Sequence, residues 1–215
     1  MSPMFRDRME AGQKLAKALT DYAGMEDGLV LALPRGGVPV AFEVAKALSL
    51  PLDIWLVRKL GVPGYEELAM GAIAAGGALY INRNVVDEYG IEKNQIDEEI
   101  EKESGELRRR AALYRGDRPP LSVRGKTVLV VDDGLATGAT MRAAVESLRH
   151  AQAAKIVVAV PVGSAEACSE LTEMADKGVC LHTPSPFFGV GQWYMDFTQV
   201  SDEDVRKILS RPDIF

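Results

Sequence analysis

The sequence feature with the clearest chemistry is an acidic pair followed by a short stretch of glycine and threonine. Asp132 and Asp133 come directly after the apolar run VLVV. Two adjacent carboxylates repel each other, so the pair is unfavourable unless hydrogen-bond donors or a cation compensate its charge. A ribose diol offers two hydroxyl donors, and Mg²⁺ offers positive charge. The pair therefore predicts a site for a sugar diol, with a magnesium ion nearby.

The stretch after the acidic pair predicts a phosphate-binding loop that opens a helix. It consists of Ala136, Thr137, Gly138, Ala139 and Thr140. The backbone N–H groups of a first helical turn, the helix dipole and the threonine hydroxyls can all point at one phosphate. Loop and acidic pair are only a few residues apart, which suits the 5-phosphate and the diol of one ribose. No lysine follows Gly138, so this is not a P-loop. An ordinary strand–turn–helix without a ligand is the alternative.

Two other apolar runs also end in residues suited to phosphate chemistry. Arg35, Gly36 and Gly37 follow one run, and Arg58 with Lys59 follow the next. Ligands of parallel α/β sheets bind at the carboxyl ends of the strands, so these residues and the acidic pair should meet at one edge.

The elements that position these residues alternate between strands and helices. This order predicts a parallel, doubly wound α/β sheet. We expect strands at Leu29–Leu33, Asp53–Val57, Lys126–Val131, Lys155–Val162 and Val179–Leu181. We expect helices at Phe5–Tyr22, Val38–Leu50, Asn94–Arg115, from the phosphate loop to Ala151, and Ser164–Lys177, with a small helix near the end. Leu60–Met70 contains glycine and proline and is interpreted as a loop, and Gly71–Ile81 as a β-hairpin.

Bulk composition limits the class of function. The 215 residues, with 47% hydrophobic residues and a net charge of −6, suit a single globular domain, residues 1–215. The acidic balance argues against nucleic-acid binding, and no apolar run approaches the ~20 residues of a membrane span. The first residues lack the apolar core of a signal peptide. Cys168 and Cys180 have no metal-site spacing, so we expect two reduced, buried thiols in a cytoplasmic protein. The sequence is compatible with a homodimer and does not determine the oligomeric state.

VLVVDDGLATGAT resembles the PRPP-binding motif of the type I phosphoribosyltransferases. The strings LPRGGVPVA, VRKLGVPG and VGQWYMDF extend the resemblance to a bacterial group of that family. It implies a sheet with a small hood, a helical insertion at about 82–120 and a C-terminal aromatic segment at about 184–215. Asp132 and Asp133 would then hold the ribose hydroxyls, and residues 136–140 the 5-phosphate.

The same resemblance assigns the leaving group and the cofactor. Arg35, Gly36 and Gly37 match the pyrophosphate loop, where a non-proline cis peptide is often found, and Arg58 and Lys59 open a flexible lid over the reacting centre. These cations and Asp132 with Asp133 would form the catalytic set. Mg²⁺ would be held mainly by PRPP, with water-mediated contacts to the acidic pair.

The acceptor side is less determined. Ala136 replaces the acid that 6-oxopurine enzymes of the family commonly carry, so hypoxanthine and guanine are disfavoured. Phe188, Trp193 and Tyr194 offer rings that could stack on a base, or that pack the tail onto the sheet. The resemblance implies transfer of the 5-phosphoribosyl group from PRPP to a nitrogenous base. A PRPP- or nucleotide-sensing protein without turnover, and hydrolysis or phosphorolysis of a related sugar phosphate, are the alternatives.

Overall fold

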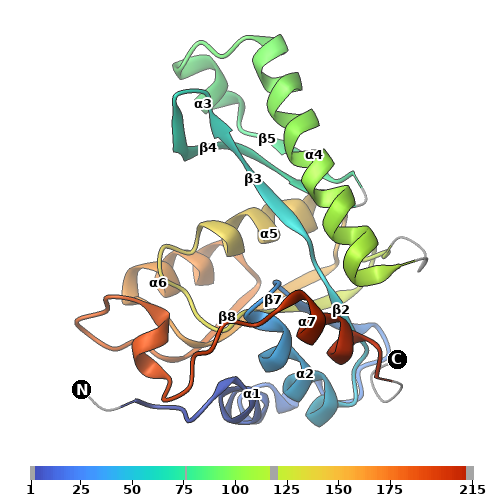
Figure 1. The fold of residues 1–215 in the computed structure, drawn as a ribbon, viewed down its shortest axis with the longest axis vertical. Coiled ribbons are helices and arrows are strands. Elements are labelled where there is room, and N and C mark those ends of the chain that lie inside the picture. The colour runs from blue at the N-terminus through green and yellow to red at the C-terminus, as the bar shows by residue number, and fades with distance from the viewer. Residues whose placement is uncertain (1–2, 76, 117–120, 212–215) are drawn as a thin grey trace.

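A five-stranded parallel sheet forms the lower part of the molecule in Figure 1. The computed structural model describes residues 3–75, 77–116 and 121–211. The strand order is β2-β1-β6-β7-β8, and all four neighbouring pairs are parallel. The strands are β1 (Gly28–Ala32), β2 (Leu52–Ile54), β6 (Thr127–Val131), β7 (Lys155–Val162) and β8 (Lys177–His182).

Helices cover both faces of this sheet, which confirms the predicted doubly wound α/β fold. The first face carries α1 (Arg8–Lys17), α2 (Gly37–Leu48) and α7 (Asp202–Leu209), and the second carries α5 (Ala139–His150) and α6 (Ala165–Met174). Successive residues of a strand point to opposite faces. Val30 therefore packs in the first core and Leu29 and Leu31 in the second. Burial on both sides explains why these strands are continuous apolar runs.

A second, antiparallel sheet and two helices stand above the body in Figure 1. We call residues 57–115 the hood. Its sheet has the order β3-β4-β5 and is flanked by a short helix and a long one. The elements are β3 (Val57–Val62), β4 (Tyr65–Ala74), β5 (Leu79–Ile81), α3 (Arg83–Glu88) and α4 (Lys93–Arg115). The hood sheet contacts α5, the helix that follows the phosphate loop, and Tyr80 of β5 lies against His150 at the end of that helix.

The predicted loop Leu60–Met70 is wrong, because this segment is most of a β-hairpin. β3 and β4 pair antiparallel, with Val62 opposite Tyr65. Pro63 and Gly64 form the two-residue turn between them, and Gly64 has a φ of +80°. Proline and glycine interrupt a strand but are also the residues that tight turns require. The hairpin Gly71–Ile81 is confirmed by the pairing of β4 with β5. Pro119 and Pro120, in the last part of the expected insertion, lie outside the described residues.

The first helix is shorter than predicted. α1 begins at Arg8 because the Asp7 side chain accepts a hydrogen bond from the backbone N–H of Glu10 and caps it. Phe5 precedes the helix and forms a bridge with Tyr194 instead. A separate 3-10 turn covers Thr20–Tyr22. Met4 and Phe5 thus lie against Trp193 and Tyr194 of the C-terminal aromatic segment.

The expectation of two reduced thiols is wrong in this structure. Cys168 in α6 and Cys180 in β8 form a disulfide, with their Cα atoms 6.3 Å apart. The crossover from α6 into β8 packs that helix on its own strand, which brings the two residues together. Sequence spacing carries no sign of this pairing. No helix within the described ranges is long and apolar enough to cross a membrane.

Candidate functional site

The acidic pair lies at the carboxyl end of β6, where the sheet meets the N-terminal segment. The Arg8 guanidinium donates from Nε to Oδ2 of Asp133 at 2.8 Å, and Asp133 is only 14% exposed. Oδ1 of Asp132 accepts a hydrogen bond from the backbone N–H of Asp133 at 2.8 Å. The hydroxyl of Tyr194 donates to the carbonyl of Asp133 at 2.6 Å. Both carboxyl groups are therefore held in fixed orientations.

Burial controls the ionisation of this pair. It raises the pKa of Asp132 well above the usual range, and the charge of Asp133 raises it further. Burial also raises the pKa of Asp133, although the Arg8 guanidinium opposes that shift. A carboxyl pair with unfavourable negative charge gains most from a ligand that brings hydroxyl donors or a cation. The environment of the pair therefore fits the predicted diol or magnesium contact.

The glycines of the Pro-Arg-Gly-Gly turn lie against the acidic pair. The expected non-proline cis peptide is present between Pro34 and Arg35. A Cβ atom on Gly36 would come within 2.1 Å of Oδ2 of Asp133, and one on Gly37 within 2.7 Å of the Val131 carbonyl. The glycines are thus required by close packing of this turn on β6, which keeps the turn beside the carboxylates.

The predicted phosphate loop, residues 136–140, opens a helix as the sequence predicts. Gly138 adopts a left-handed conformation with a φ of +72°, and α5 begins at the next residue. Thr137 and Thr140 are exposed, and the Thr137 hydroxyl accepts a hydrogen bond from the N–H of Ala139 at 3.5 Å. The Ser164 hydroxyl donates to the Ala136 carbonyl at 3.0 Å and so holds the loop in position. Exposed hydroxyls at a helix N-terminus make this loop suited to an anion.

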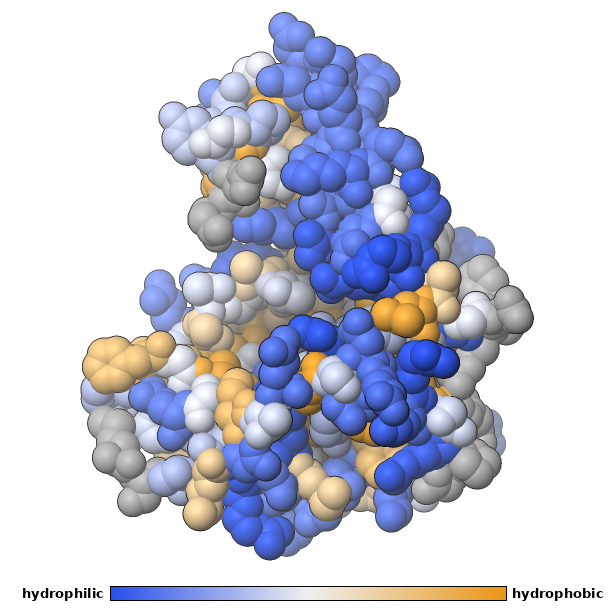
Figure 2. Space-filling view, in the orientation of Figure 1, coloured by the Kyte–Doolittle hydropathy of each residue, from blue (hydrophilic) through white to orange (hydrophobic). Residues whose placement is uncertain are grey.

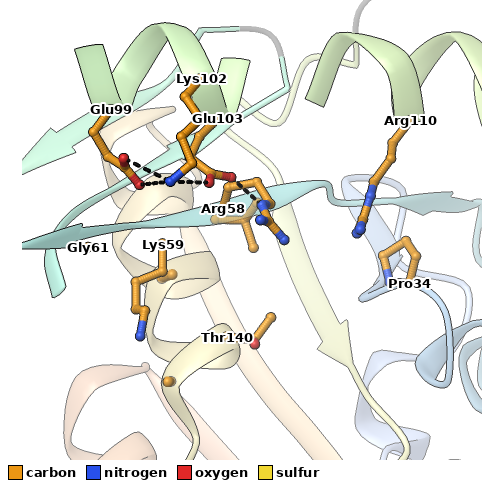
Figure 3. Close-up of a pocket in the computed structure, with 12 residues that line it drawn as sticks. Pro34, Arg58, Lys59, Gly61, Glu99, Lys102, Glu103, Arg110 and Thr140 are labelled. Atoms are coloured by element: carbon orange, nitrogen blue, oxygen red, sulfur yellow. Dashed lines mark hydrogen bonds and ion pairs between the residues drawn. The ribbon is translucent and has the colours of Figure 1, made fainter. Parts of the chain in front are cut away.

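A cleft of about 500 Å³ separates the hood from the phosphate-loop helix. Arg58 and Lys59 of β3 face it from above and Thr140 of α5 from below (Figure 3). Ala139 of α5 also lines it. The remaining residues on its walls are Pro34, Val57, Gly61, Glu99, Lys102, Glu103, Arg110 and Ala143. The surface of the hood over α4 is hydrophilic in the space-filling view (Figure 2). The cleft is therefore charged, and it adjoins both the cis-peptide turn and the phosphate loop.

Arg35 has a different position from the one expected. Its guanidinium lies 3.6 Å from Oδ1 of Asp202, the first residue of α7, and it does not line the cleft. The hydroxyl of Tyr114 donates to the same carboxylate. Burial and this hydrogen bond raise the pKa of Tyr114 to about 12. The backbone of the Pro-Arg-Gly-Gly turn reaches the site, whereas the Arg35 side chain turns towards α7.

The three aromatic candidates for base stacking also occupy different environments. Trp193 and Tyr194 are 3% and 4% exposed and pack with Phe5, so their burial favours tail packing over contact with a base. Phe188 is 83% exposed. Of the three rings, only that of Phe188 is accessible to a ligand in this structure.

Two contributions to the site have no counterpart in the sequence-based prediction. Arg8 reaches Asp133 from α1, 125 residues away along the chain. Helix α4 presents Glu99, Glu103 and Arg110 to the cleft, whereas none of its residues was assigned to the site from the sequence. Its charged residues recur at helical spacing, which does not distinguish a face towards solvent from one towards a charged cleft.

Comparison with protein-family models matches residues 6–193 to the phosphoribosyl transferase domain. The chain belongs to the phosphoribosyl transferase family. A crystal structure of a Thermus thermophilus protein is 44% identical, with a TM-score of 0.88, and the match covers 97% of this chain and 98% of that one. The hood and helical insertion of this phosphoribosyl transferase domain are therefore part of a fold that a solved structure shares.

Sequence relatives of this phosphoribosyl transferase domain agree with the family. Proteins of two Mycobacterium tuberculosis strains, named provisionally as phosphoribosyl transferases, are 46% identical over 208 residues, or 97% of this chain. The chain spans 47% of the length of those relatives. A hypoxanthine/guanine phosphoribosyltransferase of Methanohalobium evestigatum is 25% identical over 162 residues, covering 75% of this chain and 65% of its own length.

Proposed function

We propose that this chain is a Mg²⁺-dependent enzyme that binds PRPP and transfers its 5-phosphoribosyl group to a nitrogenous base, releasing pyrophosphate. The observation that carries the proposal is the convergence of three strand ends on one edge of the sheet. The acidic pair follows β6, the cis-peptide turn follows β1, and the charged hairpin follows β2. A phosphoribosyl donor presents a diol, a 5-phosphate and a pyrophosphate. The acidic pair offers a partner for the diol, the phosphate loop for the 5-phosphate, and Arg58 and Lys59 with the backbone of the cis-peptide turn for the pyrophosphate.

In this proposal the 5-phosphate binds the N-terminus of α5. The exposed Thr137 and Thr140 hydroxyls and the N–H groups of the first turn are its donors. Asp132 and Asp133 accept from the ribose hydroxyls. Such hydrogen bonds to charged groups contribute roughly 1.5–3 kcal/mol each. Their carboxyl groups are already fixed by Arg8 and by the adjacent backbone, so little ordering is needed on binding.

The leaving group lies at the cleft between the hood and α5 in this proposal. Breaking the bond from C1 to pyrophosphate leaves positive charge on the sugar and adds negative charge to the leaving group. Arg58 and Lys59 face the cleft and stabilise that charge, while Gly36 and Gly37 bring backbone close to it. Closing the hairpin turn at Pro63 and Gly64 over the site would exclude water.

The acidic pair suits a Mg²⁺ ion that is bound jointly by the protein and by the substrate. No group of three histidine, cysteine, aspartate or glutamate residues within the described chain could hold a metal, and the acidic pair supplies two carboxylates at most. Mg²⁺ is commonly bound by one or two carboxylates together with substrate phosphates and water. When bound it would neutralise part of the charge of the leaving group.

For the acceptor, Phe188 is the one accessible ring among the stacking candidates. Ala136 supplies no acid for the ring nitrogen of a 6-oxopurine, so the proposal disfavours hypoxanthine and guanine.

Calorimetry with PRPP and Mg²⁺ tests the donor site. Wild type should bind, and Asp132→Asn with Asp133→Asn should weaken binding by at least about tenfold per lost charged contact, without loss of the fold. Unchanged affinity in the double variant would show that the acidic pair is not the diol site. Pyrophosphate release with a panel of bases then separates transfer from sensing. Release that depends on one base supports the enzyme, whereas binding without release for any base supports a PRPP-sensing protein.

A further inference from the structure

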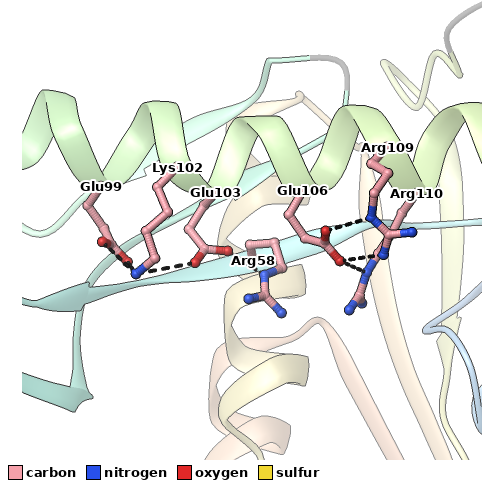
Figure 4. Close-up of polar contacts among 7 residues, drawn as sticks. All are labelled: Arg58, Glu99, Lys102, Glu103, Glu106, Arg109 and Arg110. Carbon is pink, nitrogen blue, oxygen red and sulfur yellow. Dashed lines mark hydrogen bonds and ion pairs between the residues drawn. The ribbon is translucent and has the colours of Figure 1, made fainter.

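Helix α4 is the part of the cleft wall that the proposed function leaves without a role. Glu99, Glu103 and Arg110 lie on one face of it and line the cleft (Figure 4). Charged helix faces usually point to solvent. Here the face is turned inward, over the cis-peptide turn and the phosphate loop.

Arg110 of α4 places positive charge near the cis-peptide turn, the position assigned to Arg35 from the sequence. It lines the main cleft and also a smaller hollow beside it that Pro34, Arg58 and Thr140 share. Figure 3 shows its guanidinium directed towards Pro34 of the cis-peptide turn. The guanidinium of Arg35, in contrast, lies beside Asp202. Arg110 thus brings positive charge to the turn from the opposite side of the cleft.

Two guanidinium groups of the cleft are held in the same manner. Arg110 donates from Nε to Oε1 of Glu106 at 2.6 Å, and Arg58 donates from Nε to Oε2 of Glu103. Glu103 is only 8% exposed, so its contact with Arg58 is shielded from solvent. A carboxylate on Nε leaves terminal nitrogens of the planar group available for another acceptor. Both arginines therefore present terminal donors towards the cleft while their stems are fixed.

We propose that Arg110 binds the pyrophosphate group of the donor substrate together with Arg58. This inference rests on the proposed function and adds to it a pyrophosphate contact supplied by the helical insertion. Each of the two arginines is paired with one carboxylate through Nε, so the terminal nitrogens that face the cleft can still donate to an anion there. A diphosphate has two negatively charged phosphate groups, and each can accept a bidentate contact from one guanidinium. The two carboxylates orient the arginines in advance, which reduces the entropy lost on binding.

Calorimetry with inorganic pyrophosphate, PRPP and ribose 5-phosphate, each with Mg²⁺, tests this inference. Arg110→Gln should weaken pyrophosphate and PRPP binding by about tenfold, the expected loss for a partly exposed charge-assisted contact, and should leave ribose 5-phosphate unaffected. Arg108→Gln is the matched control, because Arg108 lies on the same helix, is 67% exposed and pairs with Glu101 away from the cleft. It should bind all three ligands as wild type does.

Four outcomes would overturn the inference. Arg110→Gln could match the Arg108→Gln control for pyrophosphate, or it could lose ribose 5-phosphate to the same extent, which would indicate a general structural effect. If Arg110→Gln does not fold, Arg110→Lys replaces it as the test variant. Loss of the planar guanidinium should weaken pyrophosphate binding severalfold and leave ribose 5-phosphate unaffected, and a folded Arg110→Lys that binds pyrophosphate as wild type does counts against the inference. Wild type that binds none of the three ligands would refute the proposed function itself, and this inference with it.

Discussion

Replacing Arg8 gives the most direct test of how the acidic pair is held. Arg8 and Asp133 are 11% and 14% exposed, and their ion pair is 2.8 Å long. Arg8 also donates from Nη1 to the Thr198 carbonyl and lies 3.9 Å over the Phe197 ring. Arg8→Met keeps a long apolar stem against that ring and removes the charge. Removing one partner of a buried pair costs ~3–5 kcal/mol, and residual exposure favours the lower end, about 3 kcal/mol.

The stability lost in Arg8→Met should depend on pH, in a direction set by the pKa values of Asp132 and Asp133. Burial raises the pKa of Asp132 and of Asp133 above 3.8 in the folded protein. Between the unfolded-state and the folded-state pKa, the folded protein retains protons that the unfolded chain has released. The contribution of the two carboxyl groups to stability therefore falls as pH rises through the folded-state pKa. Without Arg8 the folded-state pKa rises further and the fall extends to higher pH. The destabilisation should therefore be greater at about pH 8 than at about pH 5, by ~1 kcal/mol or more.

Urea denaturation of wild type and Arg8→Met at both pH values measures this difference. Arg6→Met is the matched control, since Arg6 is 72% exposed and its pair with Glu10 lies at the surface. Adding Asp133→Asn to Arg8→Met should recover part of the lost stability, because Asp133 then no longer leaves a buried charge unpaired. A loss below about 1 kcal/mol, or one that is the same at both pH values, would refute this account of the pair.

Two further predictions concern packing and covalent structure. Gly36→Ala should lower the free energy of unfolding by about 2 kcal/mol, because its methyl group would lie 2.1 Å from an Asp133 oxygen that Arg8 holds in place. Gly105→Ala in α4, where nothing lies within 4 Å, should raise it by ~0.5–1 kcal/mol in the same denaturation assay; equal effects of both would contradict the close approach of Gly36. A reducing agent should lower the stability of wild type by about 2–3 kcal/mol, since the disulfide joins residues 12 apart, and should leave Cys168→Ala unaffected. A wild-type denaturation midpoint that does not respond to the thiol would argue against the disulfide.

The features that the sequence predicted correctly are those whose signal is local. The alternation of buried strands and helices follows from short apolar runs between breakers, and each run extends over one element. The start of α5 directly after Gly138 and the pairing of β4 with β5 likewise depend on residues within one short segment. In each case the backbone geometry and the side chain that stabilises it belong to the same segment.

The errors arose where one signal has two structural meanings. Pro63 and Gly64 interrupt a strand, but they also make the tight turn of the β3–β4 hairpin. The charges of α4 suit both a solvated surface and the wall of a charged cleft. Cys168 and Cys180 have a spacing that is neutral between free thiols and a disulfide, and the packing of α6 on β8 decides it.

Local sequence was thus sufficient for the strand–helix order and for the acidic pair with its phosphate loop, because these residues are contiguous and their geometry is set by neighbours along the chain. The partners of that segment were decided by the tertiary fold. Arg8 bonds to Asp133 across 125 residues, and Arg110, from a helix of the hood, lines the same cleft as Pro34 of the cis-peptide turn. Neither arrangement leaves a pattern in the sequence. Each depends on how elements that are distant in the chain pack together, and on the direction that a long, charged side chain takes in the packed structure.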